Sequence, residues 1–340
     1  DVTFLVDNGE SYEAEENLAN GFGKENVTYT VNAADKSIVM SGQMQDNQMK
    51  MNSMLKVVTT GTVTKNGDNQ SLHIADANEA VIFISADTDY KNEYPNYRTG
   101  ETKEALAASV AKTVTDAVEK GYDEVKRRHL EDYKSLFDRV QLDLGQAETN
   151  KTTDALLTAY NAAGSGAATE TERRLLETIL YQYGRYLTIA SSREGDLPAN
   201  LQGVWQNRAG SHNRVSWGCD YHMNVNLQMN YWPTYVTNLS ECADPLIRYV
   251  DSLREPGRET ARIYAGIVTD EEHPENGFMA HTQNTPFGWT CPGWKFSWGW
   301  SPSAVPWILQ NCWEYYEYTG DVDYMRERIY PMMKEAALLY

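Results

Sequence analysis

The sequence lacks long hydrophobic runs and has little positive charge. No apolar stretch approaches the roughly 18 residues that a membrane-spanning helix requires, so we expect no membrane insertion. Only 30 lysines and arginines accompany 48 aspartates and glutamates, and the net charge of −18 disfavours nucleic acid and anionic membrane surfaces as partners. This acidic, aromatic-rich composition fits a secreted or cell-surface protein that handles neutral ligands.

Motifs for several kinds of chemistry are also missing. The chain contains no GxSxG, Walker or GxGxxG pattern, which leaves elbow-type hydrolases, nucleotide binding and dinucleotide binding without support. Neither His222 nor His281 has a histidine or acidic partner four residues on, so we expect no metal and no cofactor. Cysteines are few and lack CxxC spacing, so one or two disulfides or buried thiols would both fit Cys219, Cys242, Cys291 and Cys312.

The first part of the chain is strand-like. A length of 340 residues favours two domains. Up to about residue 90, short segments rich in β-branched residues are separated by Gly, Asn and Asp, which predicts antiparallel strands, and Asn66-Gly67 is typical of a hairpin turn. The chain starts without a methionine or signal peptide and stops inside an apolar helical pattern, so we expect a fragment. Residues 1–100 are therefore interpreted as a partial β-sandwich.

A helical linker is predicted next. Apolar residues recur at three- or four-residue steps over residues 102–140, with a break expected at Gly121. The composition then shifts toward Thr, Ala, Asn and Gly over residues 146–170, which marks a boundary. Residues 101–170 are interpreted as the helical linker region.

The last part alternates helical segments with long aromatic loops. A wide apolar face follows Glu172, and residues 266–300 form a long aromatic loop of the kind that is usually functional. A helix from Asp244 is expected to stop at Pro256 and Gly257, and a second helical piece is expected from Gly257 to Ala265. Residues 171–340 therefore predict the N-terminal part of an α/α toroid, truncated, with its site at one mouth.

Residues 197–232 carry the strongest functional signal. Six asparagines, three glutamines, two histidines and three tryptophans lie in segments separated by turn residues. This mixture is too polar for a core and too aromatic for an ordinary loop. It suits a sugar, because sugars present hydroxyl groups at the ring edge and C–H groups on the ring faces.

Within this stretch, polar residues alternate with apolar ones in HMNVN. If that segment is extended, His222, Asn224 and Asn226 share one face, and Asp220 joins them two residues earlier. Trp217 would flank this face. Asparagine-rich loops also bond to their own backbone, so a purely structural role stays open.

Glycoside cleavage needs acidic groups as well. One carboxylic acid protonates the leaving oxygen, and an inverting enzyme needs a second group that activates water. The candidates near the aromatic stretch are Asp220, Glu271, Glu272 and Glu275. Asp220 is expected to partner a nearby backbone group or arginine, and Glu271 and Glu272 are expected to lie in a solvated turn. The sequence thus predicts a sugar pocket without a convincing pair of catalytic carboxylates.

Several long segments give the chain a family resemblance. They read ASSREGDLPANLQGVWQN, WGCDYHMNVNLQMNYWPTYVTNLSEC and, from HTQNTPFGWTCPGW onward, WGWSPSAVPWILQNCWEYYEYTGD. Together with the linker RRHLEDYKSLFDRVQLDLG, they resemble glycoside hydrolase family 95, the inverting 1,2-α-L-fucosidases, some of which act as α-L-galactosidases. The resemblance implies an N-terminal β-sandwich, a helical linker, an (α/α)6 catalytic barrel and a C-terminal β domain.

The resemblance also implies roles for individual residues. Asn224 and Asn226 match catalytic amides that help an aspartate to activate the attacking water. The general acid and the base match segments later than Tyr340, so the fragment alone is expected to be inactive. The residues implied in substrate binding are His222, Trp217, His281, Thr282, Trp298 and Trp300.

One of these positions is expected to set specificity. Where this chain has Thr282, some members of the family have a second histidine. The smaller threonine would leave room for the C5 methyl group of fucose, whereas an imidazole would suit the hydroxymethyl group of galactose.

The resemblance and the composition together predict an exo-acting, inverting hydrolase of terminal α-1,2-linked L-fucose. Its partner would be a fucosylated glycan, in a bacterial and extracellular or cell-surface setting, and the oligomeric state is left open. The alternatives are an α-L-galactosidase and a non-catalytic fucose-binding protein. A disaccharide phosphorylase would need phosphate ligands, and residues 197–232 have few basic residues beyond Arg208 and Arg214.

Overall fold

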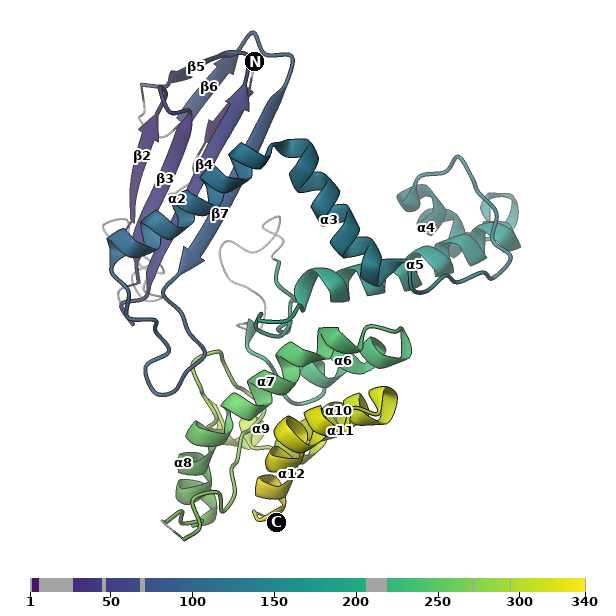
Figure 1. The fold of residues 1–340 in the computed structure, drawn as a ribbon. Coiled ribbons are helices and arrows are strands. Elements are labelled where there is room, and N and C mark those ends of the chain that lie inside the picture. Colours follow the sequence, from purple (N-terminus) through teal and green to yellow (C-terminus); the bar gives the residue numbers. More distant parts are fainter. Residues whose placement is uncertain are drawn as a thin grey trace. The chain divides into compact units, whose positions relative to one another are not determined.

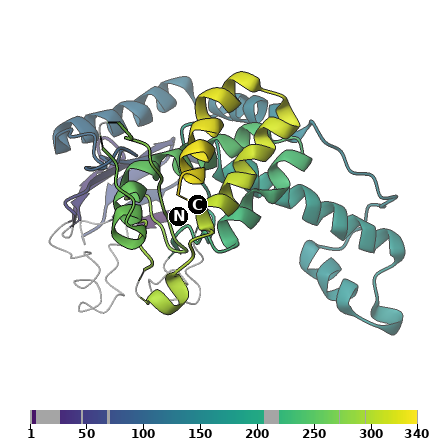
Figure 2. The same cartoon turned by 90° about the horizontal axis from the view of Figure 1, so that it is seen from below.

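Strands make up the first part of the molecule and helices the second (Figures 1 and 2). The chain divides into two compact units, Asp1–Leu130 and Glu131–Tyr340. None of the described helices has the length and apolar composition that crossing a bilayer requires. The computed structural model describes residues 2–5, 27–44, 47–67, 71–205, 219–270, 272–293 and 295–339.

The first unit contains two antiparallel sheets. One has the strand order β2-β3-β4-β7 and the other β1-β6-β5, and every strand pair is antiparallel, which confirms the expected arrangement. The strands are β1 (Val2–Leu5), β2 (Val27–Asn32), β3 (Ser37–Gln43), β4 (Lys50–Thr59), β5 (Thr62–Lys65), β6 (Ser71–Ala75) and β7 (Ala80–Thr88).

The predicted Asn66-Gly67 hairpin joins β5 to β6. The Asn66 amide donates to the Ser71 carbonyl at 3.1 Å, and Asn66 Nδ2 donates to Ser71 Oγ at 2.7 Å. Just before β5, the chain passes from one sheet to the other at Gly61, where an added Cβ would lie 2.5 Å from the Ala75 carbonyl oxygen. Only glycine fits this crossing, because the backbone of β6 occupies the space.

Both faces of the four-stranded sheet are covered. Side chains along each strand alternate between the two faces of the sheet. Ile38 of β3 points to one face and packs against Leu72 of the other sheet. Met54 of β4 points to the opposite face and packs against a helix. That helix is α2 (Lys103–Lys120), which crosses the sheet in Figure 1. Its buried residues recur at four-residue steps: Leu106, Val110 and Val114.

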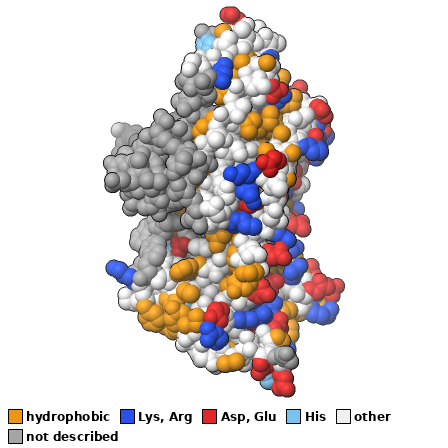
Figure 3. Space-filling model, turned by 90° about the vertical axis from the view of Figure 1, so that its left-hand side faces the viewer, with side chains coloured by type: hydrophobic (Ala, Val, Ile, Leu, Met, Phe, Trp, Pro, Cys, Tyr) orange, Lys and Arg blue, Asp and Glu red, His pale blue; other side chains and the backbone are white. Residues whose placement is uncertain are grey.

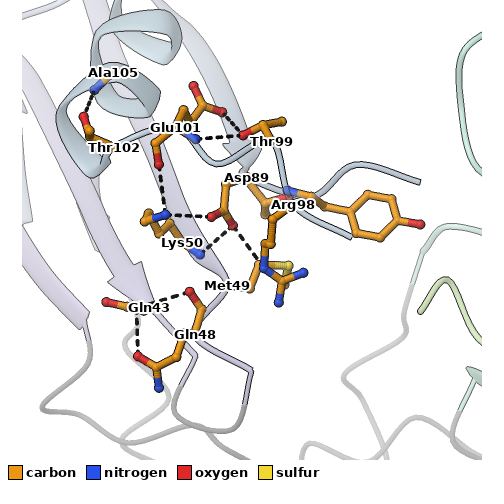
Figure 4. Close-up of polar contacts among 12 residues, drawn as sticks. Gln43, Gln48, Met49, Lys50, Asp89, Arg98, Thr99, Glu101, Thr102 and Ala105 are labelled. Carbon is orange, nitrogen blue, oxygen red and sulfur yellow. Dashed lines mark hydrogen bonds and ion pairs between the residues drawn. The ribbon is translucent and has the colours of Figure 1, made fainter. Parts of the chain in front are cut away.

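A buried carboxylate ties the loop after β7 to the start of β4 (Figure 4). Asp89 is 1% exposed, and its oxygens accept hydrogen bonds from the Lys50 amide at 2.8 Å and the Lys50 ammonium group at 2.9 Å. The same ammonium group donates to the Glu101 carbonyl, and Arg98 Nε lies 3.6 Å from the carboxylate. Two cations and two hydrogen bonds offset the cost of removing this charge from water.

The predicted break in the helical linker is confirmed. Helix α2 begins after Thr102, whose hydroxyl accepts from the Ala105 amide, and it ends before Gly121. Gly121 has a φ of +80°, a conformation that glycine adopts without strain. Helix α3 (Tyr122–Phe137) follows directly.

The second unit consists of helices joined by loops. Helix α5 begins with a capping box, in which Thr169 and Glu172 each bond the other's backbone amide. The helices are α4 (Thr153–Asn161), α5 (Glu170–Ser191), α6 (Asn226–Val236), α7 (Asp244–Ser252), α8 (Arg254–Ala265), α9 (Phe296–Gly299), α10 (Ala304–Thr319), α11 (Val322–Tyr324) and α12 (Tyr330–Ala337).

Two helices follow Asp244, as expected, but the boundary between them precedes Pro256. Helix α7 ends at Ser252, and α8 takes Pro256 and Gly257 into its first turn. The expectation was wrong because the first amides of a helix have no intrahelical partner, so proline costs little there. Glycine at 257 also allows close approach of the Met279 carbonyl oxygen, which would lie 3.0 Å from a Cβ.

A buried arginine joins three segments of the second unit. Arg185 of α5 is 2% exposed and donates to the carbonyls of Leu136, Phe137 and Thr237 at 3.0, 2.7 and 3.3 Å. These carbonyls lie at the C-terminal ends of α3 and α6, where helix dipoles are negative and carbonyls lack intrahelical partners. Burial lowers the pKa of Arg185.

Helix α6 lies in the main hydrophobic core of the second unit. Its Leu227 and Tyr231 are buried in one cluster with Leu246 of α7 and Ile308 of α10. The helix begins directly after Val225, which has a φ of +82°. A β-branched residue is strained in this region, so packing of α6 must hold it there.

The surface carries mixed charge. Figure 3 shows one face of the molecule, on which acidic, basic and hydrophobic side chains are intermingled. Exposed ion pairs such as Lys112–Asp116 and Arg262–Glu259 contribute little to stability, because water and salt screen them. Stability therefore depends more on the buried networks than on these pairs.

The Asp89 network predicts a large loss of stability when its carboxylate is removed. Asp89→Ala removes the carboxylate that lies against the Lys50 and Arg98 cations, and we expect a loss of about 3 kcal/mol in the first unit. Asp35→Ala is the matched control, because Asp35 binds Lys56 at 2.6 Å in an exposed pair. It should cost less than about 1 kcal/mol. Hydrogen–deuterium exchange of β4 and β7 amides measures both, and equal losses would contradict the prediction.

Strain at Val225 predicts that a glycine variant is more stable than an alanine variant at this position, the reverse of the usual order. In ordered segments glycine is usually less stable than alanine by about 0.5–1 kcal/mol. At a φ of +82° glycine is the unstrained residue, so we expect Val225→Gly to be more stable than Val225→Ala by about 1 kcal/mol. Urea unfolding followed by tryptophan fluorescence reports on the second unit, since all nine tryptophans lie from Trp205 onward. If Val225→Ala were the more stable variant, the backbone at this position would not be strained.

Candidate functional site

The candidate site forms where the loop before α6 meets part of the long loop before α9. The Tyr221 amide donates to the Asn284 carbonyl at 2.9 Å, and the Met223 amide donates to the Thr282 carbonyl at 2.7 Å. These bonds give the two loops an antiparallel register, although neither belongs to a sheet. We call them the first site loop and the second site loop: residues 219–225 and residues 281–284.

The HMNVN segment is not extended, so the expectation of one shared face is wrong. Residues 223–225 form a turn, and Asn226 is the first residue of α6. Asn224 is exposed and Asn226 is half-buried. The two amides therefore do not occupy alternate positions of one strand. Helical packing prevails because Leu227 and Tyr231, four residues apart in α6, are both buried in the core.

Three residues of the first site loop have positive φ angles. These are Cys219 at 52°, His222 at 47° and Val225 at 82°. Each such residue costs about 1–3 kcal/mol and persists only where its surroundings hold it. Strain of this kind is concentrated at functional sites in proteins, which supports a functional role for the loop.

Asp220 lies beside His222, as the two-residue spacing predicts. Its Oδ1 is 2.8 Å from His222 Nδ1, and the two side chains are 10% and 14% exposed. The expectation that Asp220 partners a backbone group or an arginine is wrong, because this histidine is its partner. Its second oxygen, Oδ2, is buried without a hydrogen-bond partner among the described residues.

His281 of the second site loop is completely buried. The Ser301 amide donates to its Nδ1 at 3.1 Å, and because an amide N–H only donates, the proton of the neutral ring is on Nε2. Burial lowers the pKa of His281 and keeps the ring neutral. Its Nε2 has no hydrogen-bond partner in the described part of the chain, so the ring presents a buried donor.

Aromatic rings surround His281. The Trp300 ring lies 4.5 Å from it between centroids, and the Tyr264 ring meets it edge-on at 6.0 Å. Phe296 stacks on Trp300 at 4.7 Å. Trp300 is 36% exposed, so it contacts His281 and solvent at once.

The fold gathers some of the predicted substrate-binding residues. Thr282 is 1% exposed and adjoins His281 in the second site loop, and Trp300 packs on the same histidine. The hydroxyl of Thr282 is buried without a partner among the described residues. Trp217 and the side chain of Trp298 lie outside the described residues.

The second site loop is held by residues that the sequence interpretation did not single out. The buried Asn284 accepts from the Tyr249 hydroxyl at 3.0 Å and donates to the His281 carbonyl at 2.9 Å. Gln283 packs against Gly293, where any Cβ would collide with its carboxamide. Two adjacent amides in an otherwise aromatic loop were the signal that could have identified them.

Buried polar atoms without partners are concentrated in the two site loops. Nine buried side-chain atoms lack a hydrogen-bond partner among the described residues, and four of them belong to Asp220, His281, Thr282 and Gln283. Proteins rarely leave such atoms unsatisfied, because each costs about 1–3 kcal/mol. A ligand rich in hydroxyl groups would satisfy donors and acceptors together.

The other acidic candidates are engaged elsewhere or lie at the surface. Glu275 binds Arg254 at 2.7 Å, and Glu272 is exposed. Glu271 lies outside the described residues. Over the described ranges, no group of three or more His, Cys, Asp or Glu residues could hold a metal ion.

The four cysteines are free thiols, so of the two alternatives no disulfide forms. Cys242 and Cys312 are buried. Burial raises the pKa of Cys242 to about 11, which keeps it protonated and unreactive at neutral pH.

Comparison with known families covers both units. The family model of the glycosyl hydrolase family 95 catalytic domain matches residues 121–340, and that of the glycosyl hydrolase family 65 N-terminal domain matches residues 10–93. The first match covers more than half of the chain and includes both site loops.

Curated relatives agree with this assignment. Alpha-L-fucosidase 2 of Arabidopsis thaliana is 31% identical over 281 residues, which are 82% of this chain and 31% of the relative. "Probable alpha-fucosidase A" of Aspergillus niger is 32% identical over 264 residues, which are 76% of this chain and 31% of the relative. The chain thus spans about a third of the length of the curated relatives it matches.

A solved structure is similar in fold. It is assigned as a kojibiose phosphorylase from the human microbiome, and it matches with a TM-score of 0.57 at 10% identity, over 92% of this chain and 36% of its own. Identity this low concerns the fold alone, antiparallel sheets followed by a helical region. On the sequence matches, the chain belongs to glycoside hydrolase family 95.

Proposed function

We propose that the chain is part of an exo-acting hydrolase that removes terminal α-1,2-linked L-fucose from glycans with inversion at the anomeric carbon. Family membership supports glycoside hydrolysis, and the names of the plant and fungal relatives support fucose as the sugar. The partner would be a fucosylated glycan outside the cell or at its surface. In this proposal residues 1–100 form a partial β-sandwich, 101–170 a linker, and 171–340 the N-terminal part of an (α/α)6 toroid.

The observation that carries the proposal is the pair of site loops with unsatisfied polar atoms. Among the described residues His281 Nε2 is a donor and Asp220 Oδ2 an acceptor, each without a hydrogen-bond partner. A sugar hydroxyl both donates and accepts, so a single pyranose ring suits this mixture. Trp300, packed on His281, offers a flat face for the C–H groups of the sugar. Trp298 is proposed as a further pocket wall, and Trp217 as a further substrate-binding residue.

Asn224 and Asn226 are proposed to hold the attacking water. Neither side chain forms a hydrogen bond with another described residue, and both are at least partly accessible. Their amide oxygens are therefore available to accept a hydrogen bond from water and to orient it. In an inverting reaction a carboxylate activates this water and a carboxylic acid protonates the leaving oxygen. Here both acidic groups would come from outside the two site loops.

The water-holding role predicts a loss of turnover when either amide is removed. Asn224→Ala and Asn226→Ala in the full-length protein should lower kcat on an α-1,2-fucosylated oligosaccharide by about 100-fold or more. KM should change little, because the amides orient the water rather than the sugar. Asn161→Ala, in the exposed end of α4, is the matched control and should keep wild-type kcat.

Proton NMR of the released sugar tests the stereochemical part of the same proposal. The first product should be β-L-fucose. A retained α-anomer would exclude the role given to Asn224 and Asn226. Binding of L-fucose without any release would support the non-catalytic alternative instead.

Burial of Thr282 predicts its effect on sugar preference. Thr282→His fills the space beside the sugar's C5 substituent, so the ratio of fucosidase to α-L-galactosidase kcat/KM should fall by about tenfold. Thr285→His, three residues along the same loop, is the control and should leave the ratio unchanged. Competing nitrophenyl α-L-fucoside and α-L-galactoside assays measure both. An unchanged ratio in Thr282→His would refute a role in specificity.

A further inference from the structure

A buried aspartate at the site has a histidine as its side-chain partner. Asp220 Oδ1 lies 2.8 Å from His222 Nδ1, and the aspartate side chain is 10% exposed. No lysine or arginine among the described residues forms an ion pair with it. Burial of a carboxylate without a cation is costly, so its presence here suggests a function other than stability.

The backbone around this pair is positioned without the aspartate side chain. The amides of Tyr221 and Met223 are bonded to the second site loop, and the Asp220 carbonyl accepts from the Leu201 amide at 3.3 Å. Between these anchors, His222 is held at a φ of +47°. What the Asp220 carboxylate adds is therefore the orientation and protonation pattern of the His222 ring.

The two histidines of the site are held in opposite hydrogen-bonding states. A carboxylate only accepts, so Asp220 places a proton on His222 Nδ1, and Nε2 of the neutral ring is then an acceptor. The Ser301 amide donates to His281 Nδ1 and leaves the proton of that ring on Nε2. One ring is arranged to accept at Nε2 and the other to donate.

We propose that Asp220 is a positioning residue that fixes His222 as a hydrogen-bond acceptor toward a hydroxyl group of the bound sugar, complementary to the donor His281. The identity of the sugar rests on the proposed function, whereas the state of the histidine rests on geometry. Orienting a ring in advance avoids the cost of selecting its tautomer when the ligand binds.

Nitrogen NMR on histidine-labelled full-length protein tests the state of the ring without any sugar. His222 is assigned by the signals that disappear in His222→Gln. At pH 8, where imidazole is ordinarily neutral, we expect a proton on Nδ1 in the wild type. Asp220→Ala should move it to Nε2, the form that a solvated imidazole favours. Asp220→Asn, which keeps the size of the side chain and protects the fold, should give a mixture, because a carboxamide both donates and accepts.

Calorimetry with L-fucose tests the consequence for binding. Asp220→Ala should raise Kd by about tenfold, the effect of losing one hydrogen bond between the neutral His222 ring and a sugar hydroxyl. Asp270→Ala is the matched control, because Asp270 Oδ1 lies 3.1 Å from His273 Nδ1 in an exposed pair. It should leave the Kd for L-fucose within about twofold, since surface substitutions usually have small effects.

Three results would overturn the proposal. The first is a His222 ring that keeps its proton on Nδ1 in both Asp220 variants. The second is a shifted tautomer with an unchanged Kd, and the third is an equal loss of affinity in Asp270→Ala. A wild-type protein with the Asp220-dependent tautomer that binds no L-fucose would refute the proposed sugar and support the arrangement of the histidine.

Discussion

Two backbone hydrogen bonds between the site loops are the constraint on which the candidate site depends. The amides of Tyr221 and Met223 donate to carbonyls of the second site loop, so residues far apart in sequence share one cluster. Backbone groups make this connection, so the side chain of Met223 packs in the core while that of His222 stays partly exposed. The second loop is a firm partner because Asn284 is bonded to Tyr249 of α7 as well as to its own loop. Loss of this pairing would separate Asp220 from His281.

Much of the fold followed from local patterns, and the errors have a common physical cause. Gly121 and Asn66-Gly67 were identified because each depends on the conformation of a few neighbouring residues. The start of α6 at Asn226 was missed because the alternation in HMNVN fits an extended segment. Burial of Leu227 and Tyr231 decided for the helix, and that burial depends on distant segments. The stop expected at Pro256 failed similarly, since a proline signal means different things at the start and the end of a helix.

The candidate site was predictable in composition and only partly in geometry. Asp220 and His222 meet as their two-residue spacing suggested, although His222 has a φ of +47° rather than the extended backbone on which the expectation rested. The pairing of the two site loops has no local signature, because it depends on where the helices place them. The donor state of His281 likewise depends on the Ser301 amide, which no sequence pattern brings next to it. Sequence thus indicates which chemistry is present, and packing decides which atoms face one another.

The features that suit the site to a ligand also make it costly to fold. Strained φ angles and unsatisfied polar atoms each oppose folding by about 1–3 kcal/mol, and the buried core around α6 has to offset them.

His281 makes the stability of the second unit depend on pH. Its pKa is lowered in the folded state, so below the ordinary value of about 6.5 the unfolded chain takes up a proton that the folded chain does not. The stability that depends on the neutral ring is complete above that pH and declines as the pH falls toward the lowered value. A sugar hydroxyl bound to Nε2 would oppose this loss, because it binds only the folded site loops. On the proposed function, sugar binding and folding of the site loops would therefore be coupled through the same buried nitrogen.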